Sequence, residues 1–257
     1  ISAFIKEGWI GEKFNQPNLM KIFQRDLNSK FLYHVCEKID GVPLETWMKN
    51  NPSPSLDQVK LILKQMIGAL RSLQRMDIVH CDLKPDNFLI DTNNTLTLID
   101  YGSCKIGCFE ENPADRPLGT LTYSAPEVLS GANATHKSDL FSTAIITYQM
   151  LCGHLPFKTL SSIADIPKSS QQWHYRPLNT FRQDLPQHID ATLKEALSPD
   201  PNKRTPSFSQ MFEGFKHKPN EGFNAPQKQP LITRDPTLFW QGISASLAIA
   251  LLFSLIM

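Results

Sequence analysis

The residues best suited to chemistry lie in two short stretches, His80–Asn87 (HCDLKPDN) and Asp100–Gly102 (DYG). Asp82 and Asn87 stand five positions apart, and Asp100 follows thirteen positions after Asn87. One carboxylate can take the proton of an attacking hydroxyl group, while an Asn and a second Asp hold Mg²⁺ against a triphosphate. This order of residues therefore predicts phosphoryl transfer from a nucleotide.

Three further motifs follow along the chain, Gly119–Glu127 (GTLTYSAPE), Lys137–Ser142 (KSDLFS) and Asp200–Thr205 (DPNKRT). In this order, the five motifs resemble the catalytic core of eukaryotic-type (Hanks-type) serine/threonine protein kinases. The resemblance implies an α+β, protein-kinase-like fold with a mainly helical large lobe, ATP and Mg²⁺ as cofactors, and protein substrates with serine or threonine hydroxyls. It covers about residues 1–217, with a truncated small lobe that lacks the glycine-rich loop and first strands.

The resemblance assigns roles to five residues around the transferred phosphoryl group. Asp82 is the expected catalytic base, and Lys84 would meet the developing charge on the γ-phosphate. Asn87 and Asp100 would be the Mg²⁺ ligands, because both offer the hard oxygen atoms that this ion prefers. Thr120 would bridge to Asp82 and Lys84 and shape the acceptor site.

The resemblance also implies an adenine pocket at the end of the apolar run 31–37. Backbone groups of the hinge, at Glu37 and Ile39, would hydrogen-bond adenine. Cys36 would guard the back of the pocket, and Leu89 would pack beneath the ring.

Five more residues are structural or regulatory by resemblance. Glu7 falls where the family places its ion-pairing glutamate, whose lysine partner would lie upstream of this sequence. Together with His80, Asp139 supports the catalytic loop, since it would anchor the loop backbone. A Glu127–Arg204 ion pair would hold the activation segment to the large lobe.

The hydrophobic pattern predicts the elements that position these residues. Residues 3–22 resemble the regulatory helix of the small lobe and the strand after it, and the run 31–37 is long enough for a strand. Residues 56–73 repeat apolar side chains on one face of a helix. Residues 88–99 form a hairpin that brings Asn87 and Asp100 together. Residues 140–151 are almost wholly apolar and predict a buried helix.

Composition limits the class of protein. The chain has 257 residues, of which 41% are hydrophobic and 20% are charged, enough for one good core. Its formal net charge of +1 offers no basic field, so nucleic acid is not an expected partner. The five cysteines, at positions 36, 81, 104, 108 and 152, show no metal-site spacing and predict free, inert thiols.

The C-terminal segment differs in kind. Residues 218–237 contain prolines at 219, 226, 230 and 236 and predict a juxtamembrane linker. Residues 238–257 carry no charge and, as a helix, would span roughly 30 Å, which predicts a transmembrane helix. The alternative is a buried core helix. Basic residues precede the segment and none follows, so we expect a single-pass membrane protein with its kinase domain in the cytoplasm.

Two expectations concern the assembled protein. Small side chains at positions 242, 246, 250 and 254 form a stripe along the predicted transmembrane helix, which suggests a homodimer through this helix. The chain starts at Ile1 without a signal peptide, and we interpret it as the C-terminal part of a longer protein. Its tail and its Asp-Tyr-Gly turn are similar to those of bacterial membrane-anchored bifunctional kinase/phosphatase proteins. Alone, we expect the chain to be nearly inactive as a kinase.

Two other functions remain open beside a serine/threonine kinase. A membrane-tethered pseudokinase scaffold would not need the intact set of Asp82, Lys84, Asn87 and Asp100. A small-molecule kinase can share the His-x-Asp and Asn pattern, but Lys84 and the Ala-Pro-Glu sequence that ends at Glu127 favour a protein substrate. The sequence does not identify that substrate, any upstream phosphatase domain, the oligomeric state or a regulatory signal.

Overall fold

A computed structural model describes residues 2–24, 26, 28–107, 120–160, 162–167 and 169–216 of the chain. The chain divides into two units, Ile1–Lys216 and His217–Met257, and the second unit lies outside the described residues. The helices of the first unit are α1 (Ser2–Lys13), α2 (Leu44–Asn50), α3 (Leu56–Gln74), α4 (Pro126–Leu129), α5 (His136–Cys152), α6 (Gln187–Ala196) and α7 (Phe208–Lys216). Its strands are β1 (Ile22–Phe23), β2 (Val35–Cys36), β3 (Gly41–Pro43), β4 (Ile78–Val79), β5 (Phe88–Asp91), β6 (Leu96–Leu98) and β7 (Lys105–Ile106). Short 3₁₀ turns are η1 (Pro85–Asn87), η3 (Ile163–Asp165), η4 (Ser170–Gln172), η5 (Leu178–Thr180) and η6 (Pro201–Lys203).

Helix α3 coincides with the amphipathic segment expected from the sequence. It begins after Ser55, whose hydroxyl accepts a hydrogen bond from the N–H of Gln58, while the Gln58 side chain accepts one from the N–H of Ser55. This reciprocal cap satisfies two backbone donors that the helix itself leaves unpaired. The apolar positions of its repeat are all buried, namely Val59, Ile62, Leu63, Met66, Ile67, Leu70 and Leu73.

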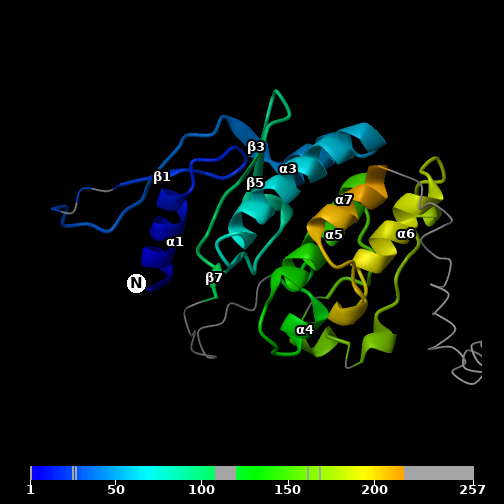
Figure 1. The fold of residues 1–257 in the computed structure, drawn as a ribbon. Helices are drawn as coiled ribbons and strands as arrows, with labels where there is room; N and C mark the ends of the chain where they lie inside the picture. Colours follow the sequence, from blue (N-terminus) through cyan, green and yellow to red (C-terminus); the bar gives the residue numbers. More distant parts are fainter. Residues whose placement is uncertain are drawn as a thin grey trace, which may run out of the picture. The chain divides into compact units, whose positions relative to one another are not determined.

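Helix α5 is the centre of the helical layer. Every residue from Ser138 to Tyr148 is buried, and α5 packs against both α3 and α6 (Figure 1). The buried hydroxyls of Thr143 and Thr147 bond within the helix, because each donates to a carbonyl one turn earlier. The helix ends at Gly153, whose φ of 73° is a left-handed conformation that glycine adopts without steric cost.

The hairpin β5–β6 is hydrogen-bonded to two other segments of this unit, strand β3 and residues 18–20. Its strands pair antiparallel with Phe88 opposite Leu98, and β3 pairs with the other edge of β5. Leu98 also bonds to the segment ahead of β1, because its N–H donates to the Asn18 carbonyl and its carbonyl accepts from the Met20 N–H. These bonds fix the hairpin, which lies between Asn87 and Asp100, to the rest of the unit.

The run 31–37 is not the continuous strand that we expected. Only Val35 and Cys36 pair, opposite Phe23 and Ile22 of β1, and residues 31–34 form no strand. Phe31 is exposed. A strand needs a bonded neighbour as well as apolar side chains, and the paired part of β1 is only two residues long.

The predicted linker at 218–237 and the predicted transmembrane helix at 238–257 lie outside the described residues. In the part of the chain that the structure describes, no helix is both long enough and apolar enough to cross a bilayer.

Candidate active site

Asp82 is held by contacts from three directions. Its Oδ1 accepts hydrogen bonds from the backbone N–H of Thr120 at 2.9 Å and from the Thr120 hydroxyl at 3.2 Å. Its Oδ2 lies 3.3 Å from Nζ of Lys84. The Asn87 side chain donates to the Asp82 carbonyl at 2.8 Å. The structure thus brings Thr120, Lys84 and Asn87, all predicted site residues, together around Asp82.

One predicted contact differs from the structure. The sequence led us to expect Thr120 to bridge Asp82 and Lys84, but among the described residues the recorded bonds of its hydroxyl and its N–H go to Asp82. Lys84 reaches the same carboxylate independently, through the other oxygen. The three groups share Asp82 because its two oxygens accept from different sides.

The backbone ahead of Asp82 is anchored to the buried core. Asp139, on α5, accepts the N–H of His80 at 2.7 Å and that of Cys81 at 3.1 Å. Burial raises the pKa of Asp139 to about 7, and the two bonds from the backbone oppose this shift. Cys81 has a φ of 71°, an unfavourable left-handed conformation for a residue with a Cβ. The two bonds to Asp139 hold the chain in this conformation.

His80 itself is fully buried. Because burial disfavours the charged imidazolium, the pKa of His80 falls to about 4, although the nearby Asp100 and Asp82 act in the opposite direction. The ring is therefore neutral near pH 7 and serves as packing beneath the loop.

Asn87 and Asp100 are brought together by the β5–β6 hairpin, as the sequence predicted. The Ile99 N–H donates to the Asn87 carbonyl at 2.8 Å, so one further ladder bond closes the hairpin between them. The Asn87 amide nitrogen is committed to the Asp82 carbonyl, which leaves its amide oxygen as the ligand atom. Asp100 is exposed. Two hard oxygen donors beside open space fit Mg²⁺, which usually binds few protein ligands plus phosphates and water.

The turn at Asp100 is conformationally strained and anchored at its next residue. Asp100 has a φ of 66°, and its Oδ1 accepts the N–H of Gly102 at 3.1 Å. Tyr101 is fully buried, and its hydroxyl donates to the Met20 carbonyl at 2.9 Å. Burial raises the pKa of Tyr101 well above its usual value, so it stays a hydrogen-bond donor. A phenolic hydroxyl can form this bond to the segment ahead of β1, whereas phenylalanine could not.

Glu7, on α1, lies beside Asp100 rather than beside a lysine. Burial raises the pKa of Glu7, and the negative charge of Asp100 raises it further. Within the described residues, the recorded side-chain contact of Glu7 is to His34, whose Nε2 lies 3.9 Å from Glu7 Oε2. The lysine partner expected by resemblance falls outside this sequence, so the role of Glu7 as an ion-pairing residue stays a prediction.

The predicted adenine-binding residues lie on two segments, residues 36–39 and strand β5. The Glu37 N–H donates to the Lys21 carbonyl at 2.9 Å, which continues the β1–β2 pairing into the hinge. The Ile39 carbonyl accepts from Gly41, and within the described part of the chain the Ile39 N–H has no recorded acceptor. Leu89 is half-buried on β5, and Cys36 is exposed. Glu37 is exposed and Ile39 is half-buried, so their role in binding adenine stays a prediction.

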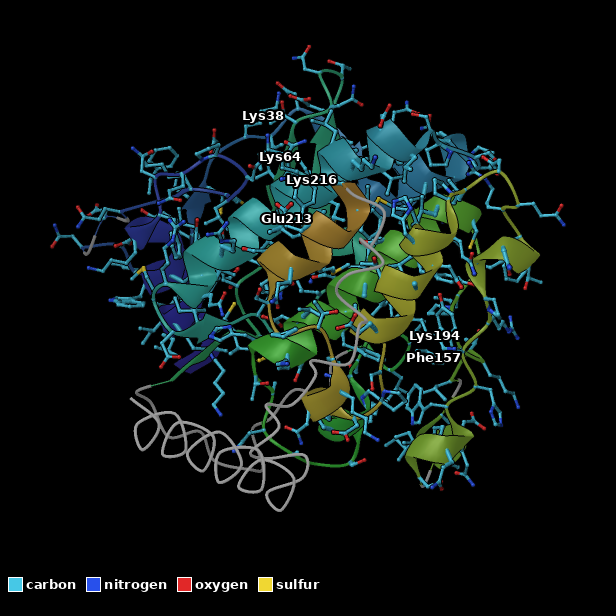
Figure 2. All side chains as sticks on the ribbon, turned by 45° about the vertical axis from the view of Figure 1, so that its right-hand side comes forward. Lys38, Lys64, Phe157, Lys194, Glu213 and Lys216 are labelled. Atoms are coloured by element: carbon cyan, nitrogen blue, oxygen red, sulfur yellow. The ribbon has the colours of Figure 1, made fainter. Side chains whose placement is uncertain are left out.

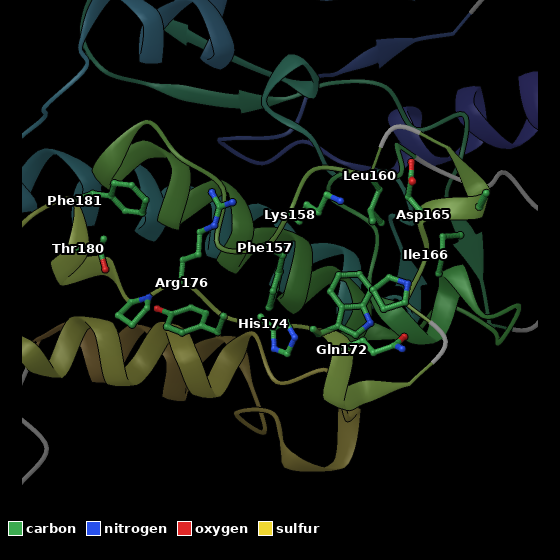
Figure 3. Close-up of a pocket in the computed structure, with 15 residues that line it drawn as sticks. Phe157, Lys158, Leu160, Asp165, Ile166, Gln172, His174, Arg176, Thr180 and Phe181 are labelled. Atoms are coloured by element: carbon green, nitrogen blue, oxygen red, sulfur yellow. The ribbon is translucent and has the colours of Figure 1, made fainter.

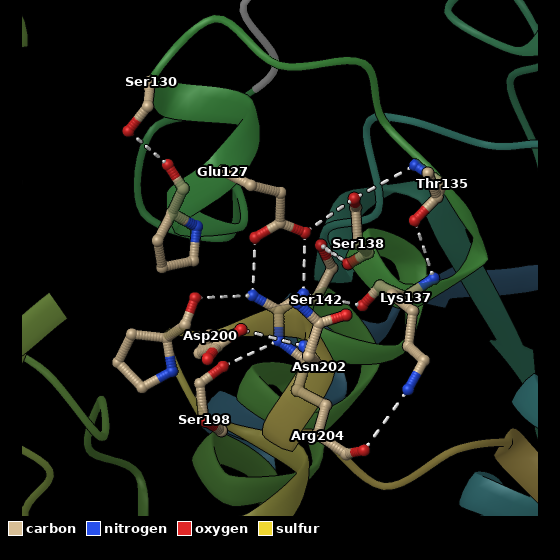
Figure 4. Close-up of polar contacts among 12 residues, drawn as sticks. Glu127, Ser130, Thr135, Lys137, Ser138, Ser142, Ser198, Asp200, Asn202 and Arg204 are labelled. Atoms are coloured by element: carbon tan, nitrogen blue, oxygen red, sulfur yellow. Dashed lines mark hydrogen bonds and ion pairs between the residues drawn. The ribbon is translucent and has the colours of Figure 1, made fainter.

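The Glu127–Arg204 ion pair is present and buried (Figure 4). Nη1 and Nη2 of Arg204 donate to the two carboxylate oxygens at 2.7 and 2.5 Å, a bidentate arrangement. Ser138 donates to the same carboxylate at 2.9 Å. The pair joins α4 to the chain directly after η6. The Ser138 hydroxyl and the Lys137 carbonyl, which accepts from Arg204 at 3.0 Å, tie both residues to the first turn of α5.

A family model described as the protein kinase domain matches residues 2–215. The chain belongs to this family. The predicted α+β, protein-kinase-like fold is thereby confirmed for the described unit. Protein kinase domains use ATP and Mg²⁺, which agrees with the oxygen donors at Asn87 and Asp100.

Curated relatives carry kinase names at low identity. A probable serine/threonine-protein kinase PknB of Lactococcus lactis is 26% identical over 212 residues, covering 82% of this chain and 34% of the relative. The serine/threonine-protein kinase PrkC of Bacillus subtilis is 25% identical over 205 residues, covering 79% and 32%. The serine/threonine-protein kinase YPK1 of Saccharomyces cerevisiae is 30% identical over 173 residues, covering 67% and 25%. The chain spans about a third or less of the length of these relatives.

Two features of this kinase domain could not be singled out from the sequence alone. His34 stacks on Phe4 at 3.8 Å between ring centroids, and it reaches Glu7 across Gly8, where a Cβ would clash with the imidazole. In the sequence, only the glycine at position 8 indicates that another side chain packs closely against this helix. The carboxylate of Asp86 lies near Glu45, and burial followed by that charge raises the pKa of Asp86.

Proposed function

We propose that this kinase domain transfers the γ-phosphoryl group of ATP to serine or threonine hydroxyls of proteins. The observation that carries the proposal is the carboxylate of Asp82, which is aligned by Thr120 and Lys84 and fixed from behind through Asp139. Such alignment supports catalysis by positioning, on which phosphoryl transfer mainly depends.

Each residue has a defined task in this reaction. ATP with Mg²⁺ supplies the phosphoryl group when bound, and Asn87 and Asp100 would hold the metal. Asp82 orients the acceptor hydroxyl and accepts its proton as the oxygen bonds to phosphorus and the bond to ADP breaks. Lys84, already 3.3 Å from Asp82, offsets the negative charge that develops between acceptor and donor.

The intact set favours an enzyme over a scaffold. A pseudokinase would gain nothing from the four bonds that converge on Asp82 and its backbone, nor from two oxygen donors at Asn87 and Asp100. Of the five non-glycine residues with positive φ in the described part of the chain, Cys81 and Asp100 lie in this site, where such strain tends to serve function.

We also propose that the domain is anchored to a membrane as part of a longer protein. Residues 238–257 carry no charge and are long enough to cross a bilayer, and basic residues precede them, which favours a cytoplasmic kinase domain. The small-residue stripe at 242–254 supports a dimer through this segment. The similarity to bifunctional kinase/phosphatase proteins would place a phosphatase upstream.

The test of the catalytic proposal uses two substitutions in the full-length protein. Asp82→Asn and Asp100→Ala should each abolish transfer of labelled phosphate from ATP to a serine-containing protein, while the melting temperature stays close to that of the wild type. Asp57→Asn removes an exposed carboxylate from the first turn of α3 and serves as the matched control. Full activity in both active-site variants would overturn the proposal.

A further inference from the structure

A groove in the described kinase domain is lined by none of the residues around Asp82. This groove, with a volume of about 930 Å³, runs along the segment 157–181, which connects α5 to α6 (Figure 3). Its volume is at the upper end of the range typical of ligand pockets. In place of a long helix, this segment contains the short turns η3, η4 and η5. The catalytic reaction derived above makes no use of this groove.

The floor of the groove is a rigid cluster of aromatic rings. Phe157 contacts Trp173 edge-to-face at 5.2 Å between centroids and stacks against Phe141 of α5 at 5.9 Å. Tyr175 packs against Phe157 at 6.3 Å, and its hydroxyl donates to Asp190 at 2.7 Å. Because these rings are fixed to α5 and α6, the apolar floor is preformed, which lowers the entropy cost of binding.

The rim of the groove is basic. Lys158 and Arg176 line it with exposed side chains, and neither has a recorded ion-pair partner among the described residues. The one acidic lining residue, Asp165, uses its carboxylate to accept bonds from the N–H and hydroxyl of Ser162. The backbone of Arg176 is fixed, because its N–H donates to the Pro156 carbonyl at 2.8 Å. An apolar floor beneath two cations complements an acidic ligand with an apolar anchor.

On one side, the residues of the groove also border the acceptor segment. A smaller hollow is lined by Thr122 and shares Phe157, Lys158, Leu160 and Trp173 with the groove. Thr122 stands two residues after Thr120, which bonds to Asp82. A chain lying in the groove would therefore border the segment that positions the acceptor hydroxyl.

We propose that this groove docks the protein substrate through a segment in which one or two apolar side chains are flanked by aspartate or glutamate. The apolar side chains pack on Phe157 and Trp173, and the carboxylates pair with Lys158 and Arg176. The proposal rests on the proposed kinase function and deepens it, since docking beside Thr122 holds a substrate near Asp82 independently of the residues around its phosphorylated hydroxyl.

Binding of a labelled peptide to the 257-residue chain tests this docking directly. The probe is a fluorescein-labelled octapeptide with leucine and phenylalanine in the middle and three acidic residues on each side. Its affinity should fall at least about tenfold when Lys158→Glu and Arg176→Glu are combined, and it should weaken as salt rises. The control combines Lys64→Glu on α3 with Lys194→Glu on α6, which reverses two charges on exposed lysines that do not line the groove (Figure 2). The control should bind as the wild type does.

Further arms of the experiment separate the alternatives. The peptide should bind the Asp82→Asn variant unchanged, so loss of phosphotransfer and loss of docking are measured independently. Replacing the acidic residues of the peptide by lysine should abolish binding. Equal affinity for the lysine peptide, or for the groove variant, would overturn the proposal. So would tighter binding of a single-stranded oligonucleotide that the groove variant loses, because cations beside aromatic rings also suit nucleic acid.

Discussion

Replacing Glu127 by alanine should leave a buried charge without its counterion. The Arg204 side chain is 0% exposed, and Glu127 accepts two of its hydrogen bonds. Breaking a buried ion pair by removing one partner costs about 3–5 kcal/mol. The guanidinium keeps its bonds to the carbonyls of Ser198, Lys137 and Pro199, at 2.7, 3.0 and 3.2 Å. We therefore expect a loss at the lower end, about 3 kcal/mol.

Thermal and urea denaturation of the 257-residue chain would measure this loss. For a unit of this size, about 3 kcal/mol corresponds to a melting temperature lower by roughly 6–12 °C. The control is Asp40→Ala, which breaks an exposed pair with Lys38 and should cost less than about 1 kcal/mol. If Glu127→Ala costs no more than Asp40→Ala, the buried pair does not hold the activation segment to α5 and the reasoning is refuted.

Two further predictions concern the catalytic loop. The pKa of His80 is lowered to about 4, so its contribution to the free energy of unfolding is present above pH 6.5 and is lost as pH falls toward 4. The free energy of unfolding should therefore decrease less between pH 6.5 and pH 4 in His80→Leu than in the wild type, by on the order of 3 kcal/mol. Urea denaturation at the two pH values measures this decrease. An equal decrease in both proteins would contradict a buried, neutral ring at position 80. Thr120→Val removes one of the two bonds to Asp82 Oδ1 and should lower kcat of the full-length protein about tenfold or more, with Thr120→Ser retaining activity. Equal kcat for the valine and serine variants would show that the hydroxyl does not position Asp82.

Local patterns predicted the helical elements well, because their cause is local. The 3.6-residue repeat at 56–73 and the reciprocal cap by Ser55 are properties of one segment, and α3 begins and ends close to the expected residues. The run 31–37 had the composition of a strand, yet only Val35 and Cys36 pair. Strand formation depends on a partner elsewhere in the chain, which composition does not reveal.

The site shows the same division between local and distant causes. Asp82 and Asn87 share one loop, and a hairpin of predictable length brings Asp100 to them. The pairing of Thr120 with Asp82 spans 38 positions and followed from the family resemblance, not from spacing. The contact of His34 with Glu7 depends on how α1 packs against the chain before β2, and only the adjacent glycine hints at it.

Two parts of the expected active site are held by different elements of the fold. The loop that carries Asp82 is bonded to Asp139, which accepts the N–H groups of His80 and Cys81. Asp139 stands on α5, whose residues from 138 to 148 are all buried, so the placement of Asp82 is set by the same apolar packing that stabilises the unit. The segment at Glu37 and Ile39, which we expect to contact adenine, depends instead on the short β1–β2 pairing. If that expectation holds, substitutions around α1 and β2 should alter nucleotide affinity while the residues around Asp82 keep their geometry. Nucleotide affinity and the geometry around Asp82 could then change separately during evolution.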